Sequence, residues 1–165
     1  MIRQIFVLPF TTLRPQLGVV RHKGREFVLA DIPGLIEGAA EGAGIGDRFL
    51  GHVERTRLLL HLVDGSSDDP VEAWRVVRSE IDSYGAGLGD KSEIIALTKA
   101  DLLDEKKRSR LVKALEKDTG ARVFPVSAPL EEGMEPLLDS VIERLGTVAT
   151  EDVLETADER PWSPL

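Results

Sequence analysis

The sequence predicts an α/β domain built on a mostly parallel sheet that is flanked by helices. Three short, continuous apolar runs bounded by turns are typical of strands that are buried on both faces. These runs span residues 57–64, 93–98 and 121–126. Helical patterns, with apolar residues three and four positions apart, alternate with them. The length of 165 residues, of which 42% are hydrophobic, is enough for one ordinary core.

The remaining elements follow from local signals along the chain. Residues 17–21 and 26–32 are β-branched and aromatic runs, and the short turn at 22–25 between them predicts an antiparallel hairpin. Asp69 is typical of the N-cap of one helix, and Gly120 of the C-cap of another. Helices are expected at residues 47–55, 70–84, 104–119 and 134–145.

Composition excludes several classes of function. With 29 Asp and Glu against 21 Lys and Arg, the net charge of -8 argues against a protein that binds the DNA backbone. The absence of Cys excludes disulfides and thiolate zinc sites, and it fits the reducing cytoplasm, where we expect the protein. The longest apolar runs, 5–10 and 58–63, are far shorter than the roughly 20 residues of a membrane span, so no membrane contact is expected.

In an open α/β sheet, ligands bind at the carboxyl ends of the strands. The first candidate there is Asp31-Ile32-Pro33-Gly34, which follows the second strand of the hairpin. A carboxylate such as Asp31 can hold magnesium through water, and Gly34 lets a backbone N–H approach a terminal phosphate. The same four residues also fit an ordinary turn.

Two further short patterns follow predicted strands. Asp101 can accept two parallel N–H bonds from the edge of guanine, which adenine does not offer, while the stem of Lys99 lies along the base. Alone, the Lys-x-Asp pattern also fits a solvated strand end. After the next strand, a backbone N–H near Ala128 can meet the guanine O6, although Ser-Ala by itself carries almost no information. The two patterns are Thr98-Lys99-Ala100-Asp101 and Ser127-Ala128-Pro129.

The order and spacing of these patterns resemble the G domain of the Obg family of GTPases. The resemblance covers residues 9–146 and includes Pro9-Phe10-Thr11-Thr12-Leu13 and the glycine-rich segment DIPGLIEGAAEGAGIGDRFLGHVERTR from Asp31. It implies a Ras-like, P-loop-NTPase-like fold, with GTP or GDP as ligand, Mg2+ as cofactor and a slow GTPase activity linked to ribosome assembly and stress control. The large ribosomal subunit is the implied partner.

The resemblance also implies roles for individual residues. Thr12 matches the switch I threonine that meets magnesium and the γ-phosphate, and Asp31 is the second magnesium ligand at the start of switch II. Phe10, Thr11, Leu13 and Arg14 are implied to lie close to the nucleotide. No catalytic residue is implied, because Leu35 stands where Ras-like enzymes place a water-orienting Gln.

The chain departs from the family pattern at its front. No G-x-x-x-x-G-K-[ST] phosphate loop occurs, and only residues 1–8, a divergent segment, precede Pro9. We therefore expect the first strand, the P-loop and the first helix to be missing. If three charge-assisted bonds of about 1.5 to 3 kcal/mol each are lost, nucleotide affinity falls by roughly three decades or more. Hydrolysis is then expected to be weak or absent.

Two hypotheses qualify this expectation. Residues 5–8 are long enough to fill the empty central position of the sheet. Alternatively, the chain is a non-catalytic interaction fragment or gene remnant that keeps only the recognition of the guanine edge. The last segment, 147–165, is expected to be an acidic, disordered tail, because the final 15 residues contain five acids and one Arg.

Overall fold

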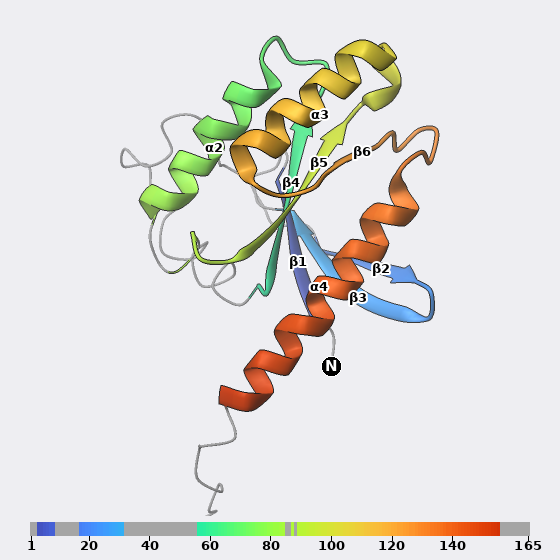
Figure 1. Cartoon of the computed structure of the whole chain (residues 1–165). Helices are drawn as coiled ribbons and strands as arrows, with labels where there is room; N and C mark the ends of the chain where they lie inside the picture. The colour runs from blue at the N-terminus through green and yellow to red at the C-terminus, as the bar shows by residue number, and fades with distance from the viewer. Residues whose placement is uncertain (1–2, 9–16, 32–55, 85–86, 88, 156–165) are drawn as a thin grey trace, which may run out of the picture.

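A computed structural model gives the structure of the chain, and it describes residues 3–8, 17–31, 56–84, 87 and 89–155 (Figure 1). The strands are β1 (Arg3–Leu8), β2 (Leu17–His22), β3 (Arg25–Asp31), β4 (Leu58–Asp64), β5 (Ser92–Thr98) and β6 (Val123–Pro125). The helices are α2 (Pro70–Tyr84), the short 3-10 helix η1 (Ala100–Leu102), α3 (Glu105–Thr119) and α4 (Met134–Glu155). The helix expected at residues 47–55 lies outside the described residues.

All six strands form one sheet in the order β2-β3-β1-β4-β5-β6. The pairs β3–β1, β1–β4, β4–β5 and β5–β6 are parallel, and among the described strands only β2 runs antiparallel to its neighbour. The predicted α/β class, with a mostly parallel sheet and an antiparallel hairpin at one edge, is confirmed.

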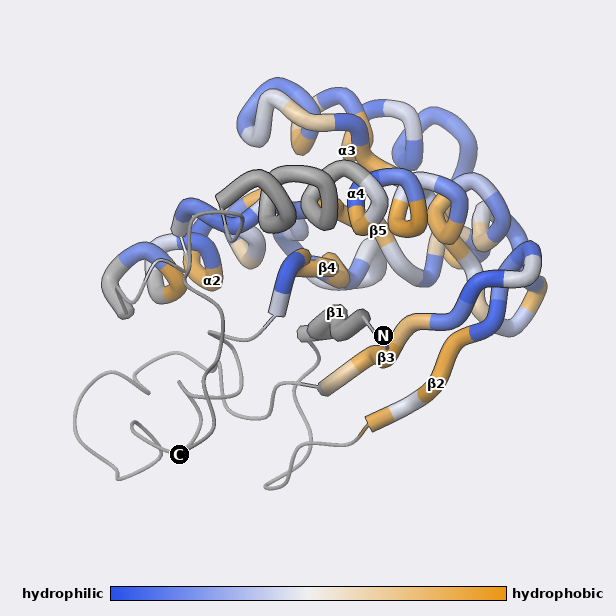
Figure 2. The backbone as a smooth tube through the Cα atoms, turned by 90° about the horizontal axis from the view of Figure 1, so that it is seen from below, coloured by the Kyte–Doolittle hydropathy of each residue, from blue (hydrophilic) through white to orange (hydrophobic). Residues whose placement is uncertain are grey.

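The centre of the sheet corrects one part of the prediction. The position expected to be empty is filled by β1, which lies between β3 and β4. The antiparallel strands β2 and β3 lie side by side at the edge of the sheet (Figure 2). Ile5 pairs in register with Leu29 of β3 and with Leu58 of β4. The hypothesis that residues 5–8 fill this position is therefore confirmed, and the strand begins two residues earlier, at Arg3.

Helices cover both faces of the sheet: α4 lies on one face, and α2 and α3 lie on the other (Figure 1). Strand β5 contributes side chains to the cores on both faces of the sheet, because successive side chains of a strand point to opposite faces. Ile94 and Ala96 belong to the core under α4, while Ile95 and Leu97 belong to the core under α2 and α3. This double burial explains why β5 has a continuous apolar sequence.

The helix boundaries confirm both predicted caps. A carboxylate oxygen of Asp69 accepts a hydrogen bond from the backbone N–H of Glu72 at 3.0 Å, so α2 begins at Pro70 as expected. Asp104, expected to open α3, is its N-cap and accepts from the N–H of Lys107. Gly120 ends α3 with φ of 66°, in the left-handed region where glycine is favoured.

The last helix is longer than predicted. Helix α4 was expected to end at Leu145, but it continues to Glu155, so residues 147–155 are helical and not part of a disordered tail. Gly146 alone does not end a helix, because a single internal glycine costs only about 1 kcal/mol relative to alanine. The acidic composition led to the prediction of disorder, although the same residues are also compatible with a helix. No helix in the described part of the chain has the length and hydropathy that a membrane span requires.

Candidate functional site

The carboxyl ends of five parallel strands meet at one edge of the sheet, and the predicted site residues that are described gather there. Asp31 ends β3, Asp64 ends β4 and Thr98 ends β5, and Asp64 pairs in register with Thr98. Ser127 comes two residues after the end of β6. The sheet therefore brings segments that are far apart in the sequence to a common edge.

Lys99 and Asp101 lie in the turn that follows β5. Lys99 adopts a left-handed conformation with φ of 54° and ψ of 36°, and it caps the short helix η1. Ala100 is buried beneath this turn, while Lys99 and Asp101 are exposed. Among the described residues, the carboxylate of Asp101 has no hydrogen-bond or ion-pair partner, so its acceptor oxygens are free for a ligand.

Hydrogen bonds join this turn directly to the loop after β6. The N–H of Ala100 donates to the carbonyl of Val126 at 3.1 Å, and the N–H of Val126 donates to the carbonyl of Leu97 at 2.9 Å. The two segments predicted to read guanine, residues 98–101 and 127–129, are therefore held side by side. Ala128 and Pro129 are exposed next to this junction.

The loop after β6 has a fixed shape. Ser127 and Glu132 exchange two backbone hydrogen bonds, of 3.0 and 3.1 Å, which close the loop at its base. Glu131 and Gly133 have positive φ angles of 55° and 71°. A Cβ atom on Gly133 would lie 2.1 Å from the carbonyl oxygen of Pro125, so only glycine fits this position without a shift of the backbone.

Ser127 carries an unsatisfied polar atom at this edge. Its side chain is fully buried, yet its hydroxyl oxygen has no hydrogen-bond partner in the described structure. Leaving a buried polar group unpaired costs about 1 to 3 kcal/mol, so such a group usually has a partner such as water or a ligand. The hydroxyl of Thr98, in contrast, donates to the carbonyl of Val63 at 3.2 Å, as a local partner within the sheet.

Sequence reasoning missed Asp64. The ammonium group of Lys99 lies 2.7 Å from one carboxylate oxygen of Asp64, and the other oxygen accepts from the N–H and the hydroxyl of Ser66 at 2.8 and 2.6 Å. Partial burial acts to raise the pKa of Asp64, but the hydrogen bonds from Lys99 and Ser66 hold it below its ordinary value. The signal in the sequence was an Asp at the end of a predicted strand, followed two residues later by Ser.

The other half of the predicted site is not described. Asp31 is placed only by its backbone, at the end of β3. The remaining predicted phosphate and magnesium residues lie outside the described residues, and these are Phe10, Thr11, Thr12, Leu13, Arg14, Ile32, Pro33 and Gly34. Within the part of the chain that is described, no group of three or more His, Asp or Glu residues could hold a metal ion.

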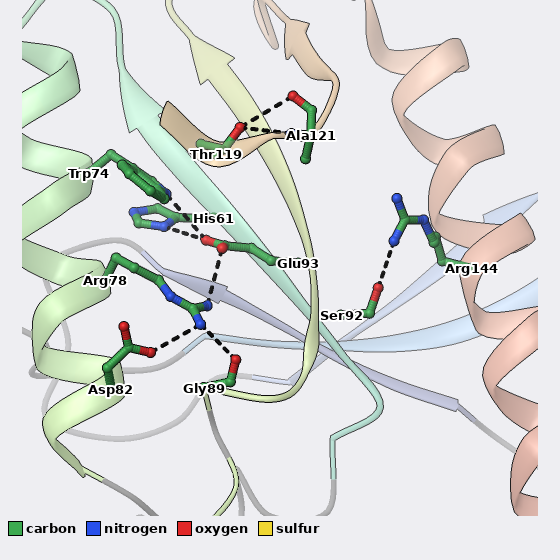
Figure 3. A network of polar contacts seen from close by, with 10 residues as sticks. All are labelled: His61, Trp74, Arg78, Asp82, Gly89, Ser92, Glu93, Thr119, Ala121 and Arg144. Carbon is green, nitrogen blue, oxygen red and sulfur yellow. Dashed lines mark hydrogen bonds and ion pairs between the residues drawn. The ribbon is translucent and has the colours of Figure 1, made fainter. Parts of the chain in front are cut away.

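A second polar cluster lies between α2 and the strands β4 and β5 (Figure 3). The buried His61 donates through Nδ1 to Glu93 at 2.8 Å, and Trp74 and Arg78 of α2 donate to the same carboxylate. Burial acts to raise the pKa of Glu93, but the contacts with His61 and Arg78 hold it below its ordinary value. This cluster ties α2 to the sheet.

Comparison with known proteins identifies relatives for most of the chain. A family model described as 50S ribosome-binding GTPase matches residues 4–99, which is more than half of the chain. The GTPase Obg of Rhizorhabdus wittichii is 59% identical over 157 residues, and that of Zymomonas mobilis is 54% identical over 159 residues. These matches cover 95% of this chain but only 45% and 46% of the two relatives, so the chain spans slightly less than half of their length.

Solved structures share the fold at low sequence identity. A nucleolar GTP-binding protein 1 from Plasmodium falciparum aligns with a TM-score of 0.65 and 16% identity, over 95% of this chain and 93% of that one. The FeoB G-domain of Methanococcus jannaschii aligns with a TM-score of 0.60 and 19% identity, over 87% and 97% of the two chains. The predicted G-domain fold is therefore confirmed.

Proposed function

Because the chain belongs to the family of 50S ribosome-binding GTPases and matches Obg GTPases over most of its length, we propose that it binds GTP and GDP at the carboxyl edge of its sheet. The observation that supports this proposal most strongly is the hydrogen bond from Ala100 to Val126, because it holds the two guanine-reading segments together. Membership of the family supports the ligand class, and the contact between the two segments supports the proposed location of the base.

Recognition of the base rests on three contacts in this proposal. The free carboxylate of Asp101 accepts hydrogen bonds from N1–H and the 2-amino group of guanine, a pair of donors that adenine lacks. The alkyl stem of Lys99 packs along the base. The backbone N–H of Ala128 donates to the guanine O6.

Recognition of the phosphates is assigned to Asp31 and to residues outside the described part of the chain. We place Thr12 and Asp31 as magnesium ligands, with Phe10, Thr11 and Gly34 near the phosphates. Asp31 ends β3 at the same edge as Lys99, which favours this assignment. Magnesium bound there would neutralise phosphate charge.

Hydrolysis is proposed to be slow or absent in this chain. Leu35 cannot orient an attacking water, because its alkyl side chain has no hydrogen-bonding group. The 165 residues also contain no G-x-x-x-x-G-K-[ST] match that would supply a phosphate-binding Lys. Binding, rather than turnover, is therefore the activity to test first.

The partner that we propose is the large ribosomal subunit, and the proposed compartment is the cytoplasm, where that subunit is found. The description of the family as ribosome-binding supports this partner. Co-sedimentation of the chain with purified 50S and 30S subunits, in the presence of GDP or GTP, tests it. Equal pelleting with both subunits would contradict the proposal.

Nucleotide binding is tested by titrating the 165-residue chain with fluorescent GDP, GTP and ADP, with and without magnesium. We expect GDP to bind more tightly than ADP. Asp101→Ala removes two charge-assisted hydrogen bonds of about 1.5 to 3 kcal/mol each, so GDP affinity should fall about 100-fold or more.

The matched control is Asp118→Ala, which removes a carboxylate on α3 that pairs with Arg75 away from the site. This variant should bind GDP as the unmodified chain does. Equal affinity for GDP and ADP, or an Asp101→Ala variant that binds GDP normally, would refute the proposed function.

A further inference from the structure

The ion pair between Lys99 and Asp64 bears directly on base recognition. The ammonium group of Lys99 lies 2.7 Å from Asp64 and 3.5 Å from the hydroxyl of Ser66. Asp101, two residues further along the same turn, carries the exposed carboxylate nearest in sequence to Lys99, and it has no partner among the described residues. Lys99 therefore pairs with a residue 35 positions away and leaves its near neighbour free.

Asp64 is held in place from several sides. It ends β4 directly opposite Thr98 in the sheet, and the next residue, Gly65, donates its N–H to the carbonyl of Thr98 at 3.0 Å. A Cβ on Gly65 would lie 2.8 Å from that same carbonyl oxygen, so the backbones of the two turns approach as closely as glycine allows. The Asp64 carboxylate then receives two hydrogen bonds from Ser66. It is a fixed acceptor, whereas Lys99 is a flexible donor.

We propose that Asp64 is a positioning residue for guanine recognition: it anchors the Lys99 ammonium group and so keeps the Asp101 carboxylate unpaired for the base. This inference rests on the proposed function. Without Asp64, the free Lys99 side chain regains its rotamer freedom and is attracted to the nearest carboxylate. An ammonium group paired with Asp101 would occupy the oxygens that accept from guanine, and the base would have to displace it.

Asp64 acts through Lys99 in this proposal, so a double-mutant cycle tests it. The four chains are the unmodified one, Asp64→Asn, Lys99→Met and the double variant, each titrated with fluorescent GDP and ADP. Methionine keeps much of the alkyl stem and removes the charge. Asp64→Asn should weaken GDP binding by about three- to fivefold, in line with an exposed ion pair. In the Lys99→Met background, the same substitution should change GDP affinity by less than about 1.5-fold.

Two further variants separate positioning from folding. Asp64→Glu keeps the charge and should restore more than half of the GDP affinity lost in Asp64→Asn. Asp118→Asn removes charge from a carboxylate paired with Arg75 on the surface, and it should leave GDP affinity unchanged. Thermal melts of all variants identify any that unfold at the titration temperature. If Asp64→Asn is one of them, the GDP affinity of the Asp64→Glu variant is compared with that of the unmodified chain instead.

The outcomes distinguish this inference from the proposed function. If the unmodified chain binds GDP no better than ADP, the proposed function fails, and the inference fails with it. If it prefers GDP but Asp64→Asn has no effect, only the inference is overturned. The inference is also overturned if Asp64→Asn weakens binding equally with Lys99 and with Met at position 99, because Asp64 would then act on the fold and not through Lys99.

Discussion

The loop between β6 and α4 depends on one glycine whose replacement has a calculable effect. Gly133 has φ of 71°, and a Cβ added to it would lie 2.1 Å from the carbonyl oxygen of Pro125. Gly120, at the end of α3, provides a matched control. Its φ of 66° is almost the same, but a Cβ added there would meet nothing within 4 Å. The two Gly→Ala substitutions therefore share the backbone strain and differ in the steric clash.

The expected magnitudes follow from these two contributions. A left-handed conformation costs an L-residue about 1 to 2 kcal/mol, which is the whole effect expected for Gly120→Ala. In Gly133→Ala, the 2.1 Å separation must grow by about 0.9 Å to reach the 3.0 Å below which Cβ contacts are essentially never seen. Pro125 lies in β6 and pairs with Leu97, so this shift strains the sheet edge. Overpacking of this kind costs about 1 to 3 kcal/mol more.

Urea denaturation followed by circular dichroism measures both variants against the unmodified chain. Gly133→Ala should lose about 2 to 5 kcal/mol of unfolding free energy and Gly120→Ala about 1 to 2 kcal/mol. Only Gly133→Ala should also weaken GDP binding, because the loop that it distorts carries Ser127 and Ala128. Equal losses of stability in the two variants would refute the steric argument, and so would a Gly133→Ala chain as stable as the unmodified one.

Three further predictions follow from single contacts. Asp101→Asn should shift the preference from guanine to xanthine nucleotides, because an Asn amide accepts from N1–H and donates to the 2-carbonyl of xanthine. Competition titrations with GDP and XDP measure this preference, and an unchanged preference would contradict the prediction. The pKa of Glu93 is below its ordinary value despite burial, because His61 donates a hydrogen bond to it. Ionised Glu93 therefore stabilises the fold when the pH is above the ordinary pKa, and this stabilisation is lost as the pH falls through the lowered pKa. The stability difference between the unmodified chain and Glu93→Gln should therefore be largest near neutral pH and shrink below about pH 4 in urea titrations; a difference that is independent of pH contradicts this. Asp69→Ala removes the N-cap of α2 and should cost about 1 kcal/mol in the same assay, whereas Asp68→Ala should change little; equal losses contradict the capping role.

Local signals were sufficient to predict the strands and helices that are buried or capped. The bounds of α2 were predicted in full, because Asp69 and Pro70 are unambiguous start signals. Strands β4 and β5 were predicted to within one residue, because burial on both faces gives a continuous apolar sequence. The end of α4 was missed, because an acidic composition favours solvent exposure in a tail and in a surface helix alike.

The candidate site was predictable in its motifs and not in its contacts. The turn at Lys99 and Asp101 and the segment after β6 were found from residue types that follow predicted strands. The Asp64–Lys99 ion pair depends on the register that places Asp64 opposite Thr98, and no local pattern fixes the register of two parallel strands joined by a crossover. The closed shape of the loop that ends at Gly133 depends on the two backbone hydrogen bonds between Ser127 and Glu132, which no local pattern predicts either.

The direction of β1 bears on the proposal that one nucleotide site lies at the carboxyl edge of the sheet. A strand inserted antiparallel between β3 and β4 would have left its carboxyl end at the far edge of the sheet. β1 is parallel to both neighbours, so Leu8 lies at the same edge as the ends of β4 and β5. β1 therefore ends at the edge that carries Lys99 and Asp101. A nucleotide site that combines the proposed base reader Asp101 with the proposed magnesium ligands Thr12 and Asp31 requires this direction of β1. Magnesium dependence of GDP binding is therefore the measurement that tests whether the two groups of residues act on the same ligand.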